Sequence, residues 1–146
     1  MVASERTERV KLSQWEALLL ESLRVLGWSD EELIAKTKRG ELPKEDTSIY
    51  EFNYAELTAF AAKEPDIFEA AVRSGYRIKY NTIRGIRSWI AVALQLEPEL
   101  VLDEGREAVI ASLTPVELER LSGVLSHGWT IANGEQEGVY RIVPQA

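Results

Sequence analysis

Basic and aromatic residues gather in one stretch of this sequence, residues 70–96. The stretch contains five basic side chains and no acidic one. Arginine and lysine neutralise phosphates and release counterions, and tyrosine rings stack on bases. One hypothesis for this stretch is therefore a nucleic-acid surface formed by Arg73, Tyr76, Arg77, Lys79, Tyr80, Arg84 and Arg87.

The spacing of the basic residues predicts two groups on two elements. Arg77 and Lys79 are two residues apart and would share one face of a short strand within residues 76–80. Arg84 and Arg87 are three apart and would share one face of a helix that follows. Together they would present cations from two adjoining elements.

A faint helix-turn-helix pattern overlaps this stretch. A first helix would end near Gly75 and a recognition helix would begin at Thr82, but six residues separate them, more than a tight turn contains. A hairpin at residues 129–143 would then act as a wing, although Glu135 and Glu137 in its loop would repel phosphate. The pattern keeps a helix-turn-helix-like or winged arrangement open as an alternative.

The charge of the rest of the chain supports a competing explanation. The net charge is −7, and the segments before and after residues 70–96 each carry −6. An acidic protein can place its one basic segment against its own carboxylates. We favour this explanation, since nucleic-acid binders usually carry a basic excess over the whole domain.

Catalytic motifs are missing from the sequence. His127 is the only histidine and lies at an expected helix end, where it would interact with free carbonyls. The chain has no cysteine, which removes thiolate chemistry and cysteine-type zinc sites. Asp103, Glu104 and Glu107 could bind a divalent cation, but a solvated acidic surface explains them better. We expect no enzyme activity, no metal and no cofactor.

A protein partner is therefore the leading functional expectation. Four tryptophans are many for 146 residues, and an exposed one would mark a contact surface. Trp28 is the candidate, because it follows Gly27 in a turn where burial is least assured. We expect a small regulatory or interaction protein acting through a protein partner, with nucleic-acid binding as the alternative and a homo-oligomer also open.

The elements that would position these residues are mostly helices. Capping pairs predict helix starts at Ser13, Ser29 and Thr114, and residues 83–96 form the most apolar helix. A hydrophobic content of 45% suits one domain over residues 1–146. We expect a compact, mainly α bundle of five to seven helices with a small C-terminal β-hairpin at residues 129–143. Residues 1–12 are expected to form a flexible arm.

The cellular compartment is inferred from what the chain lacks. It contains no cysteine for disulfides and no stretch of about 18 apolar residues to span a bilayer. The charged N-terminus has no apolar segment of the signal-peptide kind. We expect a cytoplasmic protein without membrane contact.

Overall fold

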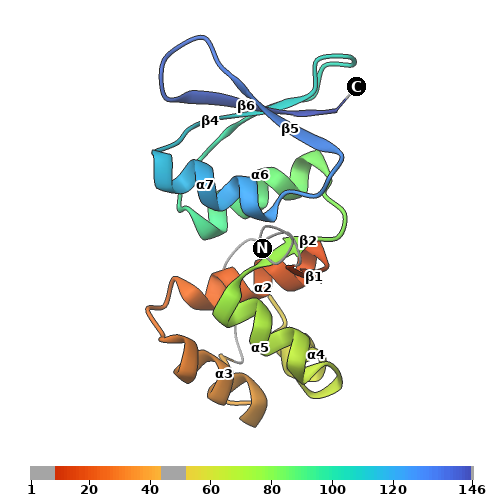
Figure 1. The fold of residues 1–146 in the computed structure, drawn as a ribbon, viewed down its shortest axis with the longest axis vertical. Coiled ribbons are helices and arrows are strands. Elements are labelled where there is room, and N and C mark those ends of the chain that lie inside the picture. The colour runs from red at the N-terminus through yellow and green to blue at the C-terminus, as the bar shows by residue number, and fades with distance from the viewer. Residues whose placement is uncertain (1–8, 44–51, 146) are drawn as a thin grey trace, which may run out of the picture.

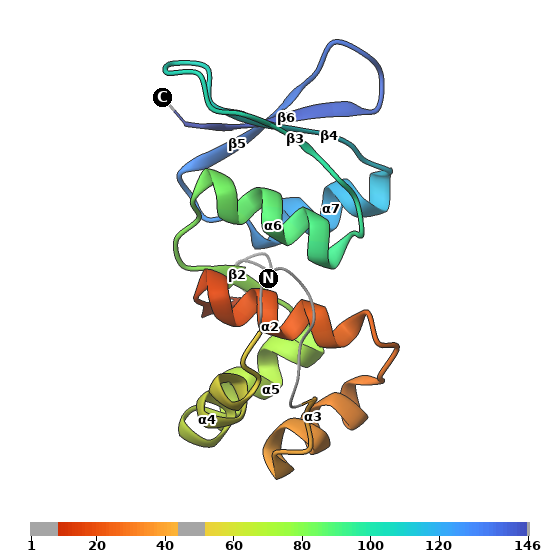
Figure 2. The same ribbon diagram turned by 180° about the vertical axis from the view of Figure 1, so that it is seen from behind.

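A computed structural model describes residues 9–43 and 52–145. Helices α2 to α5 form one end of the molecule, and a four-stranded sheet with two helices beneath it forms the other (Figures 1 and 2). Two short strands cross the middle, between these two parts. The basic segment of the sequence connects the two parts.

Four helices build the N-terminal part. They are α2 (Gln14–Arg24), α3 (Asp30–Arg39), α4 (Ala55–Lys63) and α5 (Pro65–Ser74). The predicted caps of the first two are confirmed, because the Ser13 and Ser29 side chains accept the amides of Glu16 and Glu32. These hydrogen bonds satisfy amides that the first helical turn leaves free.

A two-stranded parallel sheet connects the two parts. Strand β1 (Val10–Leu12) pairs with β2 (Tyr76–Ile78), with Val10 opposite Tyr76. The strand expected within residues 76–80 is therefore confirmed. Residues 10–12 of the expected N-terminal arm form this ladder, and residues 1–8 lie outside the described residues.

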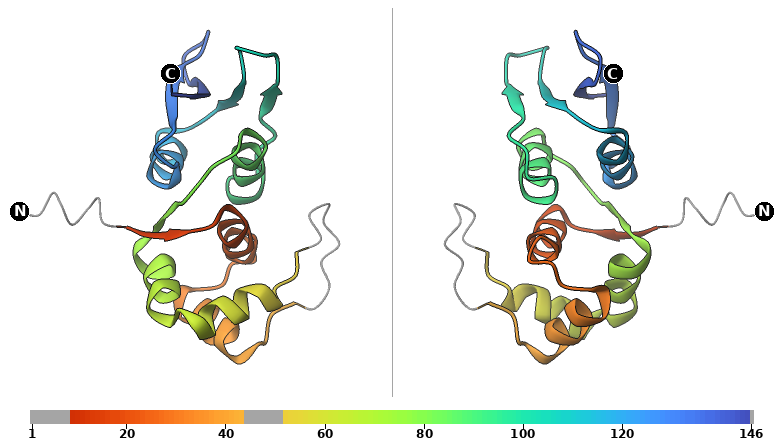
Figure 3. Two further views of the ribbon diagram at one scale, coloured as in Figure 1. Left: turned by 90° about the vertical axis from the view of Figure 1, so that its right-hand side faces the viewer. Right: turned by 90° about the vertical axis from the view of Figure 1, so that its left-hand side faces the viewer.

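The C-terminal part repeats one helix–hairpin unit. Helix α6 (Ile83–Ala93) precedes β3 (Glu99–Val101) and β4 (Ala108–Ser112), and α7 (Pro115–Val124) precedes β5 (Trp129–Asn133) and β6 (Val139–Pro144). All neighbouring strands are antiparallel, in the order β3-β4-β6-β5, so the two hairpins meet at the centre of the sheet. Helices α6 and α7 lie side by side against one face of it (Figure 3).

The prediction of a mainly α bundle with one small hairpin is wrong. Six strands in two sheets accompany six helices in the described residues, so the fold is mixed α and β. The error lies in residues 99–112, for which no strand was predicted. They form a hairpin whose loop contains Gly105 at a φ of 79°, and β4 then pairs with β6. The predicted hairpin at residues 129–143 therefore forms the outer half of a larger sheet.

Helix α6 is the central core helix, as its apolar sequence predicts. Ile86, Trp89 and Ile90 are almost completely buried. The helix itself lies between α2 on one side and the sheet on the other (Figure 2). In the described residues, no helix combines the length and the apolar character needed to cross a membrane.

Candidate functional site

The connection from β2 to α6 is held in place by a buried asparagine. Asn81 is 3% exposed, and its side-chain oxygen accepts the amide of Ser126 at 2.7 Å. The backbone N–H of Asn81 donates to the Ser126 hydroxyl at 3.1 Å. This pair of hydrogen bonds ties the connection to the segment that follows α7.

A second tether comes from the start of α2. The Gln14 side-chain oxygen accepts the amide of Thr82 at 3.0 Å, and its nitrogen donates to the Thr82 hydroxyl at 3.2 Å. Gly85 makes room for Gln14, since a Cβ there would lie 1.8 Å from the Gln14 Oε1. The connection is thus fixed from two sides.

This fixed connection displays Lys79 and Tyr80, and the first turns of α6, which follows it, display Arg84 and Arg87. Tyr80 is 80% exposed, the highest value among the large hydrophobic side chains of the described residues. Lys79, Arg84 and Arg87 are also exposed, and within the described part of the chain none of them forms an ion pair. We call these four residues the basic surface. The connection from β2 to α6 runs along the right side of Figure 1.

The N-terminus of α6 differs from the other helix N-termini of the described residues. Each of the other five helices has an acidic residue in its first turn, whereas α6 has none and carries Arg84 there. The helix macrodipole disfavours a cation at this end by about 0.3–1 kcal/mol. Arg84 thus lies at a helix end that disfavours a cation, and within the described residues no carboxylate pairs with it.

Three residues predicted for this surface do not belong to it. Tyr76 is 2% exposed, because its ring packs in the core and its hydroxyl bonds to buried groups. Arg73 forms a salt bridge with Glu31, whose pKa it lowers through a hydrogen bond. Arg77 donates to the carbonyl of Leu125. Internal charge matching therefore accounts for one of the five cations, Arg73. Arg77 bonds to a neutral carbonyl, and the other three form no ion pair within the described residues.

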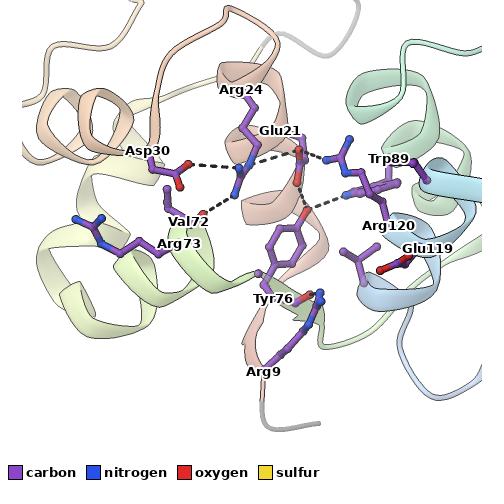
Figure 4. A pocket seen from close by; sticks show the side chains of 13 residues that line it. Arg9, Glu21, Arg24, Asp30, Val72, Arg73, Tyr76, Trp89, Glu119 and Arg120 are labelled. Carbon is purple, nitrogen blue, oxygen red and sulfur yellow. Dashed lines mark hydrogen bonds and ion pairs between the residues drawn. The ribbon is translucent and has the colours of Figure 1, made fainter. Parts of the chain in front are cut away.

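A buried carboxylate lies at the junction of the two parts of the molecule. Glu21 of α2 is 3% exposed and accepts hydrogen bonds from the Tyr76 hydroxyl at 2.6 Å and from the Arg120 Nη2 at 3.1 Å (Figure 4). The Trp89 indole donates to the Tyr76 hydroxyl at 2.8 Å. Burial, followed by the charge of Glu21, raises the pKa of Tyr76 well above its usual range. We call this cluster the junction network.

A hollow of about 580 Å³ opens beside the junction network, lined by Arg9, Arg24, Arg73 and Arg120 among others. The Glu21 carboxylate is already bonded, and Arg24 Nη2 donates to the carbonyl of Val72 at 3.0 Å. Most of these groups bond to one another, which is the chemistry of a structural junction, but among the described residues the buried Arg24 Nε has no hydrogen-bond partner and lies 3.7 Å from the Glu21 Oε1. In the described residues, no group of three or more His, Asp or Glu side chains is placed to hold a metal ion.

Trp28, the predicted contact residue, is half-buried. It packs against the core, and the Lys36 Nζ lies 5.3 Å from the centre of its ring. Trp15 is the most exposed tryptophan at 36%, and its ring packs on Phe52 at 5.3 Å. Trp28 is thus held by the core and by Lys36, and its role in binding stays a prediction.

Sequence analysis missed the residues that fix the basic surface. Gln14 and Ser126 are 68 and 45 residues away from their partners Thr82 and Asn81, so no local pattern connects them. Lys11 was also missed; it is exposed and pairs in register with Arg77 across the β1–β2 ladder. A local signal was available only for Thr82, whose side chain caps α6.

Comparison with known proteins does not assign this fold or site. No family model, no curated protein and no solved structure matches the chain. The function must therefore be argued from the mixed α and β fold and from the geometry of its surfaces.

Proposed function

We propose that this chain is a non-enzymatic binding protein whose basic surface binds single-stranded nucleic acid. The observation that carries the proposal is Tyr80, which is 80% exposed on a connection held by Asn81 and Gln14. The backbone beside Tyr80 is already tethered, so it loses little conformational freedom when a base stacks on the exposed ring. Lys79, Arg84 and Arg87 add positive charge for the phosphates.

The arrangement supports binding of single strands better than reading of a duplex. Strand β2 stands where a helix-turn-helix motif has its tight turn, and the predicted wing belongs to the four-stranded sheet. Stacking on Tyr80 requires an unpaired base, whereas three cations form a small footprint for a duplex. We therefore expect a loop or an unpaired end as the ligand.

Fluorescence anisotropy with a labelled oligonucleotide, measured over a salt series, tests the proposal. Three phosphate contacts predict a slope of about −2 for log K against log salt, since single strands give about −0.7 per contact. Single-stranded RNA and DNA oligonucleotides are compared with a duplex of the same sequence. Tighter binding of the duplex would contradict the stacking argument.

Two variants separate charge from stacking. Arg84→Glu with Arg87→Glu should weaken binding strongly and flatten the salt slope, because two phosphate contacts are lost. Tyr80→Ala should weaken binding by about 1–3 kcal/mol while the slope stays unchanged, because the lost interaction is with a base. Both changes lie on exposed side chains, so the fold should remain intact by circular dichroism.

The matched control reverses two cations elsewhere. Lys63→Glu with Arg106→Glu makes the same change of net charge at exposed positions of α4 and the β3–β4 loop. This variant should bind nearly as well as the parent at about 0.1 M salt, where distant charges are screened beyond about 10 Å. Equal losses in the two double variants would show that only overall charge matters, and the proposed surface would be wrong.

We further propose that the protein is cytoplasmic and that it also binds a protein partner. A cysteine-free regulator of this kind would bind RNA or DNA through the basic surface and a protein elsewhere.

A further inference from the structure

The two borders of the four-stranded sheet are built differently. Strand β3 forms one border; it has three residues, includes the exposed Glu99 and follows Pro98. Short length, charge and proline are the means by which proteins keep a sheet edge from pairing with another chain. Strand β5 forms the other border (Figure 1), and its five residues, Trp129–Asn133, include no charged residue and no proline. The β5 edge therefore lacks the protection that the β3 edge has.

The hydrogen bonds between β5 and β6 show which backbone groups of β5 point outward. The Gln145 amide donates to the Gly128 carbonyl at 2.9 Å, and the Gly134 amide donates to the Val139 carbonyl at 2.7 Å. Hydrogen-bonded pairs alternate along an antiparallel ladder, so the even-numbered residues of β5 bond to β6. The N–H and C=O groups that point away from the sheet therefore belong to Trp129, Ile131 and Asn133.

These outward groups form the free edge of the sheet. Within the described residues, β6 is the only strand that pairs with β5, and no hydrogen bond joins the outward groups to another element. A row of alternating donors and acceptors of this kind is a template for one more strand. The added strand must itself present N–H and C=O groups at every second residue.

We propose that β5 pairs antiparallel with β5 of a second copy, about a two-fold axis at Ile131, so that two sheets become one. In this register Ile131 lies opposite its own symmetry mate, and Trp129 lies opposite Asn133 of the other copy. All three outward residues then form hydrogen-bonded pairs, with the alternation that an antiparallel ladder requires. Because both copies use the same strand, the contact is closed and yields a dimer.

The charges beside β5 favour a second copy in the antiparallel direction. The loop after β5 carries the exposed Glu135 and Glu137, and the turn before it carries the exposed His127. Antiparallel pairing keeps the two acidic loops at opposite ends of the seam, each toward the turn of the other copy that contains His127. Parallel pairing would bring the acidic loops together, which charge repulsion opposes. The strand itself carries no charge that would repel its copy.

Sedimentation of the full chain over a range of concentrations tests the proposal. We expect a dimer that dissociates on dilution. Asn133→Pro removes one outward N–H from each copy and should raise the dissociation constant of the dimer by about tenfold or more. Asn133→Ala changes the same side chain but keeps the N–H, so it should stay within about threefold of the parent.

The fold of the proline variant is checked separately. Proline is tolerated at an edge position whose N–H faces solvent, so circular dichroism should show an intact monomer. A parent chain that stays monomeric at the highest concentration would overturn the proposal and leave the edge to an extended segment of another protein. A dimer that Asn133→Pro does not weaken would place the contact elsewhere and would overturn it as well.

Cysteine cross-linking tests the register, because the chain contains no cysteine of its own. Ile131→Cys places two thiols at the axis, where the Cα atoms of a hydrogen-bonded pair lie about 5.5 Å apart, within the reach of a disulfide. Asn133→Cys is the matched control. Residue 133 is the more exposed of the two, but it lies roughly 14 Å from its symmetry mate, an offset of about four residues along the seam.

Mild oxidation should link the Ile131→Cys chains into covalent dimers and leave the Asn133→Cys chains unlinked. Equal or stronger linking of Asn133→Cys would overturn the register. The pairing does not rest on nucleic-acid binding, since β5 contains no residue of the basic surface. Arg84→Glu with Arg87→Glu should therefore dimerise as the parent does, and a monomer in that variant would assign the contact to the basic surface instead.

Discussion

The junction network gives a stability prediction that the structure makes quantitative. Glu21→Gln keeps the size of the side chain but removes the charge that holds Tyr76 and Arg120. A hydrogen bond to a charged group contributes about 1.5–3 kcal/mol, and the amide that replaces one carboxylate oxygen would face another donor. Arg24 and Arg120 are 30% and 41% exposed and can be hydrated, so their share is at most about 1 kcal/mol. We expect a loss of about 2 kcal/mol in the free energy of unfolding.

Urea unfolding followed by tryptophan fluorescence measures this loss. The midpoint should fall while the slope with denaturant stays constant, because the surface exposed on unfolding does not change. Glu104→Gln, an exposed loop position with the same chemical change, should stay within about 0.5 kcal/mol of the parent. If Glu21→Gln is neutral or stabilising, the cost of desolvating the buried carboxylate cancels its interactions, and the reasoning fails.

Three further predictions follow from single side chains. Tyr76→Phe should reduce the loss of stability above pH 10. Burial raises the pKa of the phenol in the folded protein, so its contribution to stability is complete below the unfolded value of 10.0 and is lost as the pH rises. Unfolding measured from pH 8 to 11 tests this. Gly85→Ala should displace Gln14 and speed amide exchange at Thr82, while the free energy of unfolding changes by less than about 1 kcal/mol because alanine favours the helix. Thr37→Val should stabilise the protein by about 1 kcal/mol in thermal unfolding, since the Thr37 hydroxyl is buried without a hydrogen-bond partner; a loss would mean that the added methyl does not fit.

The sequence by itself determined where several helices begin and which helix is the most apolar. The capping side chains of Ser13, Ser29 and Thr114 act within four residues, so their helices begin where the pattern predicts. The apolar helix α6 and the strand at Tyr76 follow from periodicity in the same way. A cap or a periodic face depends on neighbours in the chain, and those neighbours are visible in the sequence.

Tertiary structure alone decided which cations remain free. Arg73 and Arg84 are both basic residues in helices, but only the first has a carboxylate, Glu31, brought to it from 42 residues away. The four-stranded sheet likewise depends on β4 pairing with β6, a contact that no local pattern in residues 99–112 encodes. Tyr76 and Tyr80 would share one face if the strand continued, but Tyr76 is buried and Tyr80 is exposed. The strand ends at Ile78, where packing against α2 and α7 also ends.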